Sequence, residues 1–480
     1  MSWLSRIISR ALICALLGVQ LPPLVSAQWH VGSLTDTTNR ADYVIVTPQS
    51  YVSAIQPLAE FRSNRRSLSV SIVLLDSIAA QFPGHSPDSS IRAFVSYTLT
   101  HWQSPHPQYL LLAGNVNVIP SHSVASVFSA EFGEDSVMVD QWYVNQLSES
   151  QPIPYPLMAV GRYPAWSGDE LAAMVSKTII YEQSETGPWA TRSIAVADSG
   201  DGGIFEYDAM TQQMAAVPRW KDTLTIHVNP GSLLHKSRNE FFEIWNQGCG
   251  VVNFVGNATG PLFSRASYFT SRDVDSLSSS SSLPLCLIGG GQRFDQKDTA
   301  SIAVAVMQGS NRGAVCVIAP VGLMWESQNA EFADSLFGQL TKHNDMSIGA
   351  AWLHVEQQLL IDIENRRTLL GDPALLPKFR TIASADEPGV SIPLGFALLQ
   401  NYPNPFNPST TIRYGLPHRS HVTLTVYNTL GQQLATLINS DIDAGYHEIQ
   451  FNANNLASGV YFYRIQAGEF TATKRLLLLK

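Results

Sequence analysis

Two series of short apolar segments occupy the chain up to about residue 380, before a region with a different pattern. These apolar segments lie at 42–47, 69–75, 108–114, 193–198, 250–256, 283–290 and 313–319. Segments long enough for helices separate most of them, and 90–99 has a helical pattern. Strands that are apolar on both faces and alternate with helices indicate a mostly parallel sheet covered by helices on both sides. We therefore expect two α/β subdomains, at 28–185 and 186–380, packed side by side.

The pattern changes towards the C-terminus, where short strands with a period of two residues replace the apolar runs. Apolar and polar residues alternate at 422–426, and 460–465 is rich in aromatic and β-branched residues, as half-buried strands are. Turn-forming residues separate these strands at intervals typical of a small sandwich. We therefore predict a small all-β, immunoglobulin-like sandwich at 396–480, behind a polar, proline-containing linker at 381–395.

The first 27 residues have the pattern of a secretory signal peptide. Arg6 and Arg10 provide positive charge, a largely apolar stretch follows, and small residues end at Ala27. The apolar stretch contains two prolines and is short for a membrane span. We expect cleavage before Gln28, so that 1–27 is removed and the mature protein, without a transmembrane segment, leaves the cytoplasm.

Composition is that of a globular protein, with 45% hydrophobic and 14% charged residues in a chain of 480. The formal net charge of −9 and the lack of a long basic run argue against nucleic acid as a partner. Removal of Cys14 with the signal leaves Cys249, Cys286 and Cys316, which argues against a disulfide framework. Their spacing is not that of a zinc site. Because Cys286 and Cys316 lie in apolar runs, we expect both to be buried.

The C-terminal region carries a series of short motifs that indicate secretion. They are NYPNPFNP from Asn401, the turn Leu430-Gly431, the strand start GVY from Gly459, and a basic, apolar end at 474–480. The region resembles the C-terminal sorting domain of type IX secretion, the outer-membrane export route of Bacteroidetes-type bacteria. The resemblance implies a Gram-negative owner, secretion to the medium or the outer-membrane surface, and the type IX machinery as a partner. An adhesive sandwich that is not recognised for export is the alternative.

Six further motifs follow one another through the two α/β series. They are DYVIVTP at 42–48, YLLLAG at 109–114, DQWY at 140–143, GRYP at 161–164, KTIIYE at 177–182 and LGDP at 370–373. Each motif alone is weak, but their order resembles the catalytic region of gingipain-type cysteine peptidases, a clan with caspase-like folds. The resemblance covers about 42–376 and implies the gingipain-like arrangement of two α/β subdomains.

Catalysis in that family uses two side chains at the carboxyl ends of neighbouring strands, a histidine base and a cysteine nucleophile. The segment Phe254-Val255-Gly256 matches the strand before the histidine, which places Asn257 at the position of the base. The pair Phe294-Asp295 matches residues that follow the nucleophile, which places Gly289 at the position of the cysteine. Asparagine does not titrate near neutral pH, and glycine has no side chain. The resemblance therefore implies that both catalytic residues are replaced.

Cys286 is an alternative nucleophile. It lies three residues before Gly289 on the same predicted strand, and this odd offset places its side chain on the opposite face. Two hypotheses follow. The first, which we favour, is a secreted or surface protein whose peptidase domain is non-catalytic and binds peptides or partner proteins in its cleft. The second is an active cysteine endopeptidase with relocated catalytic groups such as Cys286.

One metal site is also a candidate. The segment DSGDGG at 198–203 offers the carboxylates of Asp198 and Asp201 to a calcium ion, an ion common in secreted proteins of this kind. The spacing is not that of an EF-hand loop, so an exposed turn is the simpler interpretation. No other cofactor is expected.

Overall fold

The computed structural model describes most of the residues of the chain. They are 28–29, 32–126, 136–148, 151–198, 222–228, 235–256, 258–259, 262–263, 267–289, 301–322, 326–342, 345–359, 367–378, 396–398, 401, 406–416, 418–468 and 470–478. The predicted signal peptide at 1–27, the linker at 381–395, Asp201 and Asn257 lie outside these described residues.

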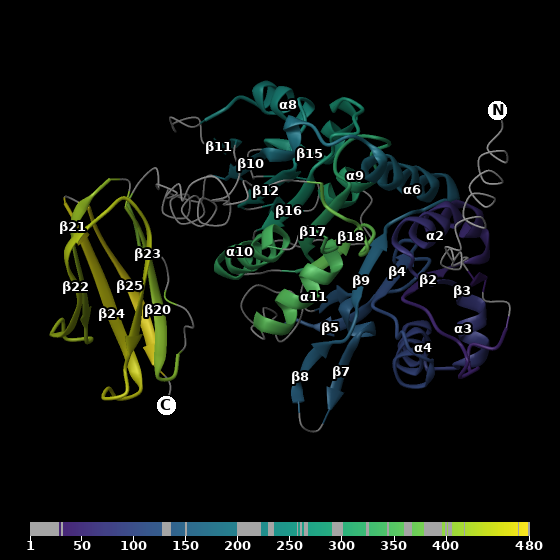
Figure 1. Cartoon of the computed structure of the whole chain (residues 1–480), viewed down its shortest axis with the longest axis horizontal. Helices are drawn as coiled ribbons and strands as arrows, with labels where there is room; N and C mark the ends of the chain where they lie inside the picture. The colour runs from purple at the N-terminus through teal and green to yellow at the C-terminus, as the bar shows by residue number, and fades with distance from the viewer. Residues whose placement is uncertain are drawn as a thin grey trace, which may run out of the picture.

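One eleven-stranded sheet forms the centre of the α/β region (Figure 1). Six of its strands run in one direction, in the order β1 (Gln28–Trp29), β3 (Val70–Leu74), β2 (Tyr43–Thr47), β4 (Tyr109–Ala113), β9 (Ala159–Tyr163) and β18 (Arg367–Leu370). The other five continue the sheet as β17 (Cys316–Pro320), β16 (Leu285–Gly289), β12 (Val251–Val255), β10 (Arg192–Ala197) and β11 (Asp222–His227). All seven predicted apolar segments form strands of this sheet.

The two groups of strands run in opposite directions because β17 and β18 pair antiparallel, whereas the other neighbours pair parallel. The two predicted series of strands are therefore the two halves of one continuous sheet. β18 is the exception, because it comes late in the chain but runs with the first half. Since the halves run in opposite directions, the carboxyl ends of their strands lie at opposite edges of the sheet.

Helices cover both faces of each half. In the first half, α2 (Val52–Arg66) and α6 (Gly168–Gln183) pack on one face, and α3 (Leu75–Gln81) and α4 (Pro87–His101) pack on the other. In the second half, α8 (Arg238–Asn246) and α9 (Ile302–Gln308) face α10 (Glu326–Lys342) and α11 (Ile348–Leu359) across the sheet. The strands are buried on both faces, which explains their continuous apolar runs.

Serine residues define where three of these helices begin. Ser86 precedes α4 and Ser237 precedes α8, and each forms a reciprocal capping box with the residue three positions later. Ser167 precedes α6, and its Oγ accepts a hydrogen bond from the backbone N–H of Glu170 at 3.2 Å. These caps occupy N–H groups that would otherwise have no partner inside the helix.

Short elements connect the main ones. They are η1 (Gln49–Tyr51), β5 (His122–Ala125), β6 (Ser136–Val139), η2 (Gln141–Tyr143), β7 (Asn145–Ser148), β8 (Gln151–Pro156), η3 (Pro188–Thr191), β13 (Ala258–Thr259), β14 (Leu262–Phe263), β15 (Phe269–Thr270) and η4 (Ser271–Ser276). β5 pairs with β6, β7 pairs with β8, and β13 to β15 form a three-stranded sheet.

A buried ion network joins distant parts of the α/β region. Arg62 donates from Nε to Asp372 Oδ2 at 2.7 Å, and from Nη1 and Nη2 to the Glu182 carboxylate at 2.9 and 2.7 Å. The Tyr43 hydroxyl donates to Asp372 Oδ1 at 2.7 Å. All four residues are buried. The network fixes α2, the last turn of α6 and the turn after β18 to one another.

A second buried arginine fixes the carboxyl end of the first half. Arg162 of β9 donates to the carboxylate of Asp140 from Nε at 2.8 Å and from Nη2 at 2.7 Å. Its Nη1 donates to the carbonyl oxygens of Gly114 and Ile119 at 2.7 and 2.8 Å. Asp140, Arg162 and Asp372 belong to the motifs DQWY, GRYP and LGDP, so these motif residues hold the fold together.

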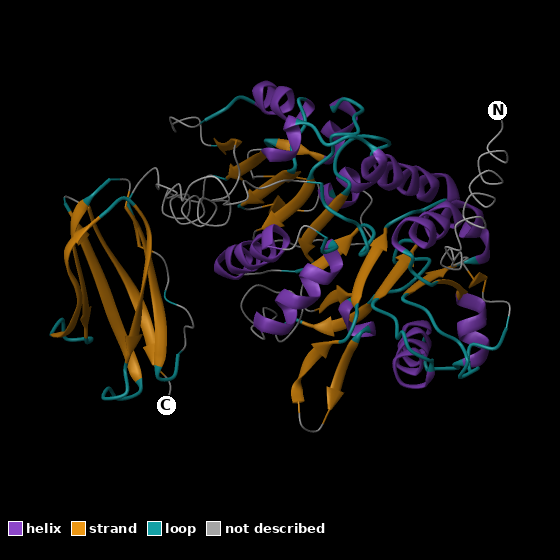
Figure 2. Cartoon of the chain, viewed as in Figure 1, coloured by secondary structure: helices purple, strands orange, loops and turns teal. Residues whose placement is uncertain are grey.

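The C-terminal region forms the predicted sandwich, which Figure 2 shows as strands joined by loops. One sheet contains β19 (Ala397–Leu398), β20 (Ser409–Leu416) and β23 (Gly445–Asn452), and the other contains β22 (Gln433–Ile442), β21 (Ser420–Tyr427), β24 (Gly459–Ala467) and β25 (Phe470–Leu478). Both sheets contribute to one apolar core, which includes Ile412, Leu424 and Tyr463.

Candidate active site

The carboxyl ends of β12 and β16 meet at one edge of the second half of the sheet (Figure 1). Val255, the last residue of β12, pairs with Gly289, the last residue of β16. The backbone N–H of Gly256 then donates to the carbonyl oxygen of Gly289 at 3.0 Å. Because Asn257 follows Gly256 directly, the two sequence-predicted positions lie on neighbouring strands at the same edge, although the side chain of Asn257 lies outside the described residues.

Gly289 leaves the end of β16 without a side chain. A Cβ atom built on it would lie 3.2 Å from the Cβ of Asn329 and 3.4 Å from the carbonyl oxygen of Phe254. Asn329, from the beginning of α10, is buried, and its Nδ2 has no hydrogen-bond partner within the described structure. A larger residue at position 289 would therefore press against Asn329, which already fills this side of the edge.

Cys286 faces the other side of the sheet. Its thiol belongs to the apolar cluster that contains Phe254 and Ile288, whereas Leu285 and Leu287 belong to the cluster under α10 and α11. The side chain is fully buried, and burial raises the pKa of the thiol to about 12. A thiol with this pKa is almost entirely protonated at neutral pH, and the protonated form is a poor nucleophile.

Asp198 lies beside the candidate position of the base. Its backbone N–H donates to the carbonyl oxygen of Val255 at 3.0 Å, which extends the pairing of β10 and β12 by one residue. A Cβ atom at Gly256 would lie 2.1 Å from the Cβ of Asp198, so only glycine fits between the two strands here. Asp198 is 3% exposed, and the exposed turn that the sequence predicts is therefore wrong at this residue.

The second calcium candidate, Asp201, lies outside the described residues. No group of three or more histidine, cysteine, aspartate or glutamate side chains that could hold a metal ion occurs in the described part of the chain. The described structure therefore supplies Asp198 as a buried carboxylate at this edge.

The structure brings one histidine to this edge that the sequence analysis does not select. His227 ends β11 and pairs with Ala197 of β10, which in turn pairs with Val255. Its carbonyl oxygen accepts a hydrogen bond from Nδ1 of His235 at 3.0 Å. Three strand spacings separate β11 from β16, a distance of roughly 14 Å. His227 is therefore too far from β16 to act on a residue at position 289.

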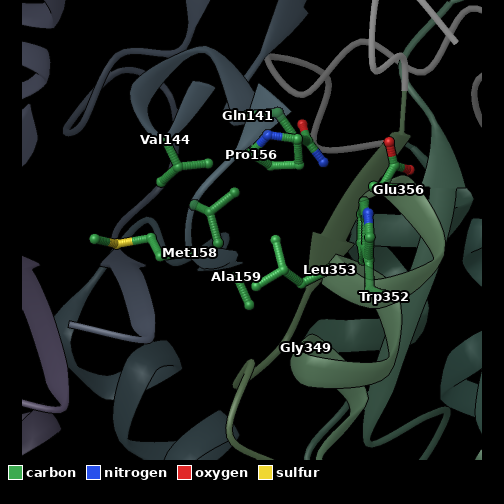
Figure 3. A pocket seen from close by; sticks show the side chains of 10 residues that line it. Gln141, Val144, Pro156, Met158, Ala159, Gly349, Trp352, Leu353 and Glu356 are labelled. Carbon is green, nitrogen blue, oxygen red and sulfur yellow. The ribbon is translucent and has the colours of Figure 1, made fainter. Parts of the chain in front are cut away.

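A small cavity lies beside β9, in the first half of the sheet. Figure 3 shows Gln141, Trp352 and Glu356 among the side chains that line it. It has room for about one water molecule, and Gln141 Oε1 is a buried acceptor without a partner in the described structure. The cavity is three strand spacings from β16, again roughly 14 Å, so it is separate from the candidate active site.

The comparisons with known proteins agree with this geometry. The chain matches the model of peptidase family C25 over residues 36–378 and that of the secretion system C-terminal sorting domain over residues 400–479. The chain therefore belongs to peptidase family C25. Its sorting domain directs it to the cell surface or the extracellular space by type IX secretion. No described helix is both long and apolar enough to cross a membrane.

Solved structures show the same fold at low sequence identity. The crystal structure of the Arg-specific cysteine proteinase gingipain R has a TM-score of 0.57 and 17% identity, covering 92% of this chain and 99% of that one. The complex of Porphyromonas gingivalis RgpB pro- and mature domains has a TM-score of 0.56 and 18% identity, covering 92% of this chain and 100% of that one. No curated protein sequence matches the chain.

Sequence reasoning placed Gly289 at the edge but missed Asn329. The sequence around Asn329 gives no signal of a site, because a polar residue near the beginning of a helix is common. Only the packing of α10 against β16 shows that this side chain lies against the position expected for the nucleophile.

Proposed function

We propose that the family C25 domain of this protein is non-catalytic and binds extended peptide segments at the edge formed by β12 and β16. The observation that carries the proposal is Gly289, which ends β16 without a side chain where the family nucleophile is expected. Asn257 at the matching position of the base adds to it. Gly289 has no side chain that could attack a carbonyl, and the amide of Asn257 does not transfer a proton near neutral pH.

The magnitude of this loss favours binding over catalysis. General acid–base transfer contributes about a hundredfold to ten-thousandfold to a rate, and the thiolate provides the covalent route itself. Loss of both removes the acyl-enzyme pathway, even if the fold still holds a peptide. A protein that keeps the fold of an enzyme and its sheet edge but lacks the catalytic residues is expected to bind ligands without converting them.

Asn329 indicates which ligand chemistry would suit this edge. Its Nδ2 is a buried donor without an acceptor within the described structure, next to the position that a nucleophile would fill. An unsatisfied buried donor costs about 1–3 kcal/mol. A ligand carbonyl oxygen that accepts this hydrogen bond would recover part of that cost, and peptide backbones supply such carbonyls at every residue.

The alternative is an active cysteine endopeptidase that uses Cys286. Complete burial and a pKa of about 12 both oppose this, because the reactive form of cysteine is the accessible thiolate. The thiol also lies on the face away from Asn329. Such an enzyme would have to shift β16 by three residues to bring this thiol to the position of Gly289.

The test uses the mature chain from Gln28 to Lys480 and its Cys286→Ala variant. Each is incubated with an iodoacetamide-type activity probe and a broad peptide library. We expect no cleavage and no site-specific labelling by either protein. Labelling or cleavage by the parent chain that disappears in Cys286→Ala would establish the peptidase instead.

Binding is measured separately, by equilibrium capture of blocked library peptides on the immobilised mature chain. Asn329→Asp replaces the Nδ2 donor with an acceptor of the same shape, and we expect it to weaken capture about tenfold, or about 1.4 kcal/mol. Asn117→Asp, an exposed asparagine in the first half, is the matched control. Absence of capture by the parent chain would refute the binding role, whereas equal capture by all three proteins would refute only the part assigned to Asn329.

A further inference from the structure

The four-stranded sheet of the sorting domain ends in a long edge strand. Its order is β22-β21-β24-β25, so β22 pairs with β21 on one side and has no strand on its other side among the described residues. β22 runs over ten residues, from Gln433 to Ile442, and most of its side chains are exposed or partly exposed. Its pairing with β21 is irregular at Leu434 and Leu437, which have no partner in the register, and regular from Ile438 to Ile442. The regular stretch presents a row of backbone N–H and C=O groups that can pair with another extended chain.

Charge is one of the features that protect edge strands from pairing, and β22 carries little of it. Its single charged residue, Asp441, is already engaged by β21, because His421 Nδ1 lies 2.9 Å from Asp441 Oδ1. The pKa of His421 is raised by this hydrogen bond. The opposite outer strand, β25, carries Lys474 and Arg475, and Phe406 pairs with its end at Leu478. Since lysine and other charges on an edge block pairing, the two edges of the same sheet differ in what they allow.

Two exposed leucines stand at the beginning of this strand. Three large hydrophobic side chains in the described structure are exposed by more than a third: Ile180 at 39%, Leu430 at 81% and Leu434 at 39%. Two of the three therefore lie in one hairpin, Leu430 in the turn between β21 and β22 and Leu434 in β22 itself.

The turn that carries Leu430 is held in one conformation. Asn428 Oδ1 accepts from the backbone N–H groups of Leu430 and Gln432, both at 3.0 Å. The backbone N–H of Gly431 donates to the carbonyl oxygen of Asn428, also at 3.0 Å, and Gly431 has the positive φ of 76° that this turn requires. An apolar side chain on a fixed turn loses little conformational entropy when a partner covers it.

We propose that β22 and the leucines at its start form the surface by which the sorting domain docks to the export machinery. The partner is an extended strand of a protein of that machinery, which adds to the sheet beside β22 and places an apolar side chain over Leu430. Backbone hydrogen bonds along the edge provide affinity, and the leucines set the register. The matched sorting domain is the part of the chain that this machinery reads. The proposal is independent of any role of the peptidase-like edge.

The test follows export of the full-length chain in a bacterium that carries the type IX system. Thr436→Lys with Ser440→Lys places two cations on β22. Thr471→Lys with Thr473→Lys does the same on β25 and is the matched control, because Thr436 and Thr473 each make one exposed side-chain hydrogen bond. We expect the β22 pair to lower the exported fraction about tenfold, a loss of about 1.4 kcal/mol of binding, and the β25 pair to leave it near the parental value.

A second pair of variants tests Leu430 without altering the strand. Leu430→Ser is expected to lower export, whereas Ile180→Ser, on α6 of the α/β region, is expected to leave it unchanged. Resistance of each purified full-length variant to limited proteolysis shows whether it remains folded. Leu430→Ser lies in an exposed turn and gives a result even if the lysine variants fail to fold.

Three outcomes would overturn the proposal. Normal export of folded lysine variants would show that β22 is not used, and equal loss from both lysine pairs would show a general effect of charge. The third outcome has two parts: the parental mature chain is a dimer in solution, and the β22 lysines dissociate this dimer without lowering export. The partner that pairs with this edge would then be a second copy of the chain.

Discussion

The buried network around Arg62 gives the sharpest test of how this fold is held together. Arg62→Met keeps the volume and the apolar stem of the side chain but removes its positive charge. It removes the ion-pair partner of two buried carboxylates, Asp372 at 0% and Glu182 at 3% side-chain exposure. Breaking a buried pair by removing one member costs about 3–5 kcal/mol, because the remaining charge stays desolvated.

This free energy translates into a measurable change in melting temperature. An unfolding entropy of about 2.1 cal/mol/K per residue gives about 0.7 kcal/mol/K for the roughly 340 residues of the family C25 region, so the melting temperature should fall by about 4–7 °C. Tryptophan fluorescence of the mature chain is a suitable assay, because every tryptophan precedes residue 353 and the sandwich contains none. The signal therefore reports on the α/β region alone.

Lys236→Met is the matched control. Lys236 pairs with Glu240 at 3.3 Å, but both side chains are more than a third exposed, and such surface pairs contribute little to stability. We expect its melting temperature to stay within about 1.5 °C of the parental value. If Arg62→Met lowered the melting temperature no more than Lys236→Met does, the network would add nothing to stability and the reasoning from burial would be wrong.

Four further predictions concern the Cys286 thiol, the site edge and export. Cys286 should resist iodoacetamide at pH 8 in the folded chain and react after denaturation, as measured by mass spectrometry. The pKa of its thiol is about 12 in the folded chain and 9.0 for an ordinary solvated cysteine, so the thiol loses its proton at lower pH in the unfolded chain. The free energy of unfolding should therefore fall as pH rises from 9 to 12, and it should fall less in Cys286→Ala. Gly256→Ala should destabilise the chain in urea unfolding, because the added Cβ would lie 2.1 Å from the Cβ of Asp198. Gly338→Ala should not, because a Cβ added there would have no other atom within 4 Å. Secreted protein should begin near Gln28 by N-terminal sequencing, and export of a chain truncated before residue 396 in normal amounts would contradict the sorting role.

Local sequence determined much of this protein. The continuous apolar runs predicted strands buried on both faces, and all seven became strands of the central sheet. The period of two residues in a strand sufficed to place Cys286 and Gly289 on opposite faces, because side chains alternate whatever surrounds them. The alternating pattern of 422–426 likewise predicted β21 and the sandwich. These features depend on residues close together in the chain, so they can be predicted from the sequence.

Tertiary structure alone decided how these elements combine. β18 enters between β9 and β17 and reverses the direction of the second half, which puts the carboxyl ends of the two halves at opposite edges. Packing brings Asn329 against Gly289, and Arg62 against Asp372 across 310 positions of the chain. No local periodicity encodes such contacts, because they arise when separate helices and strands bury their apolar faces together and thereby fix which polar groups meet.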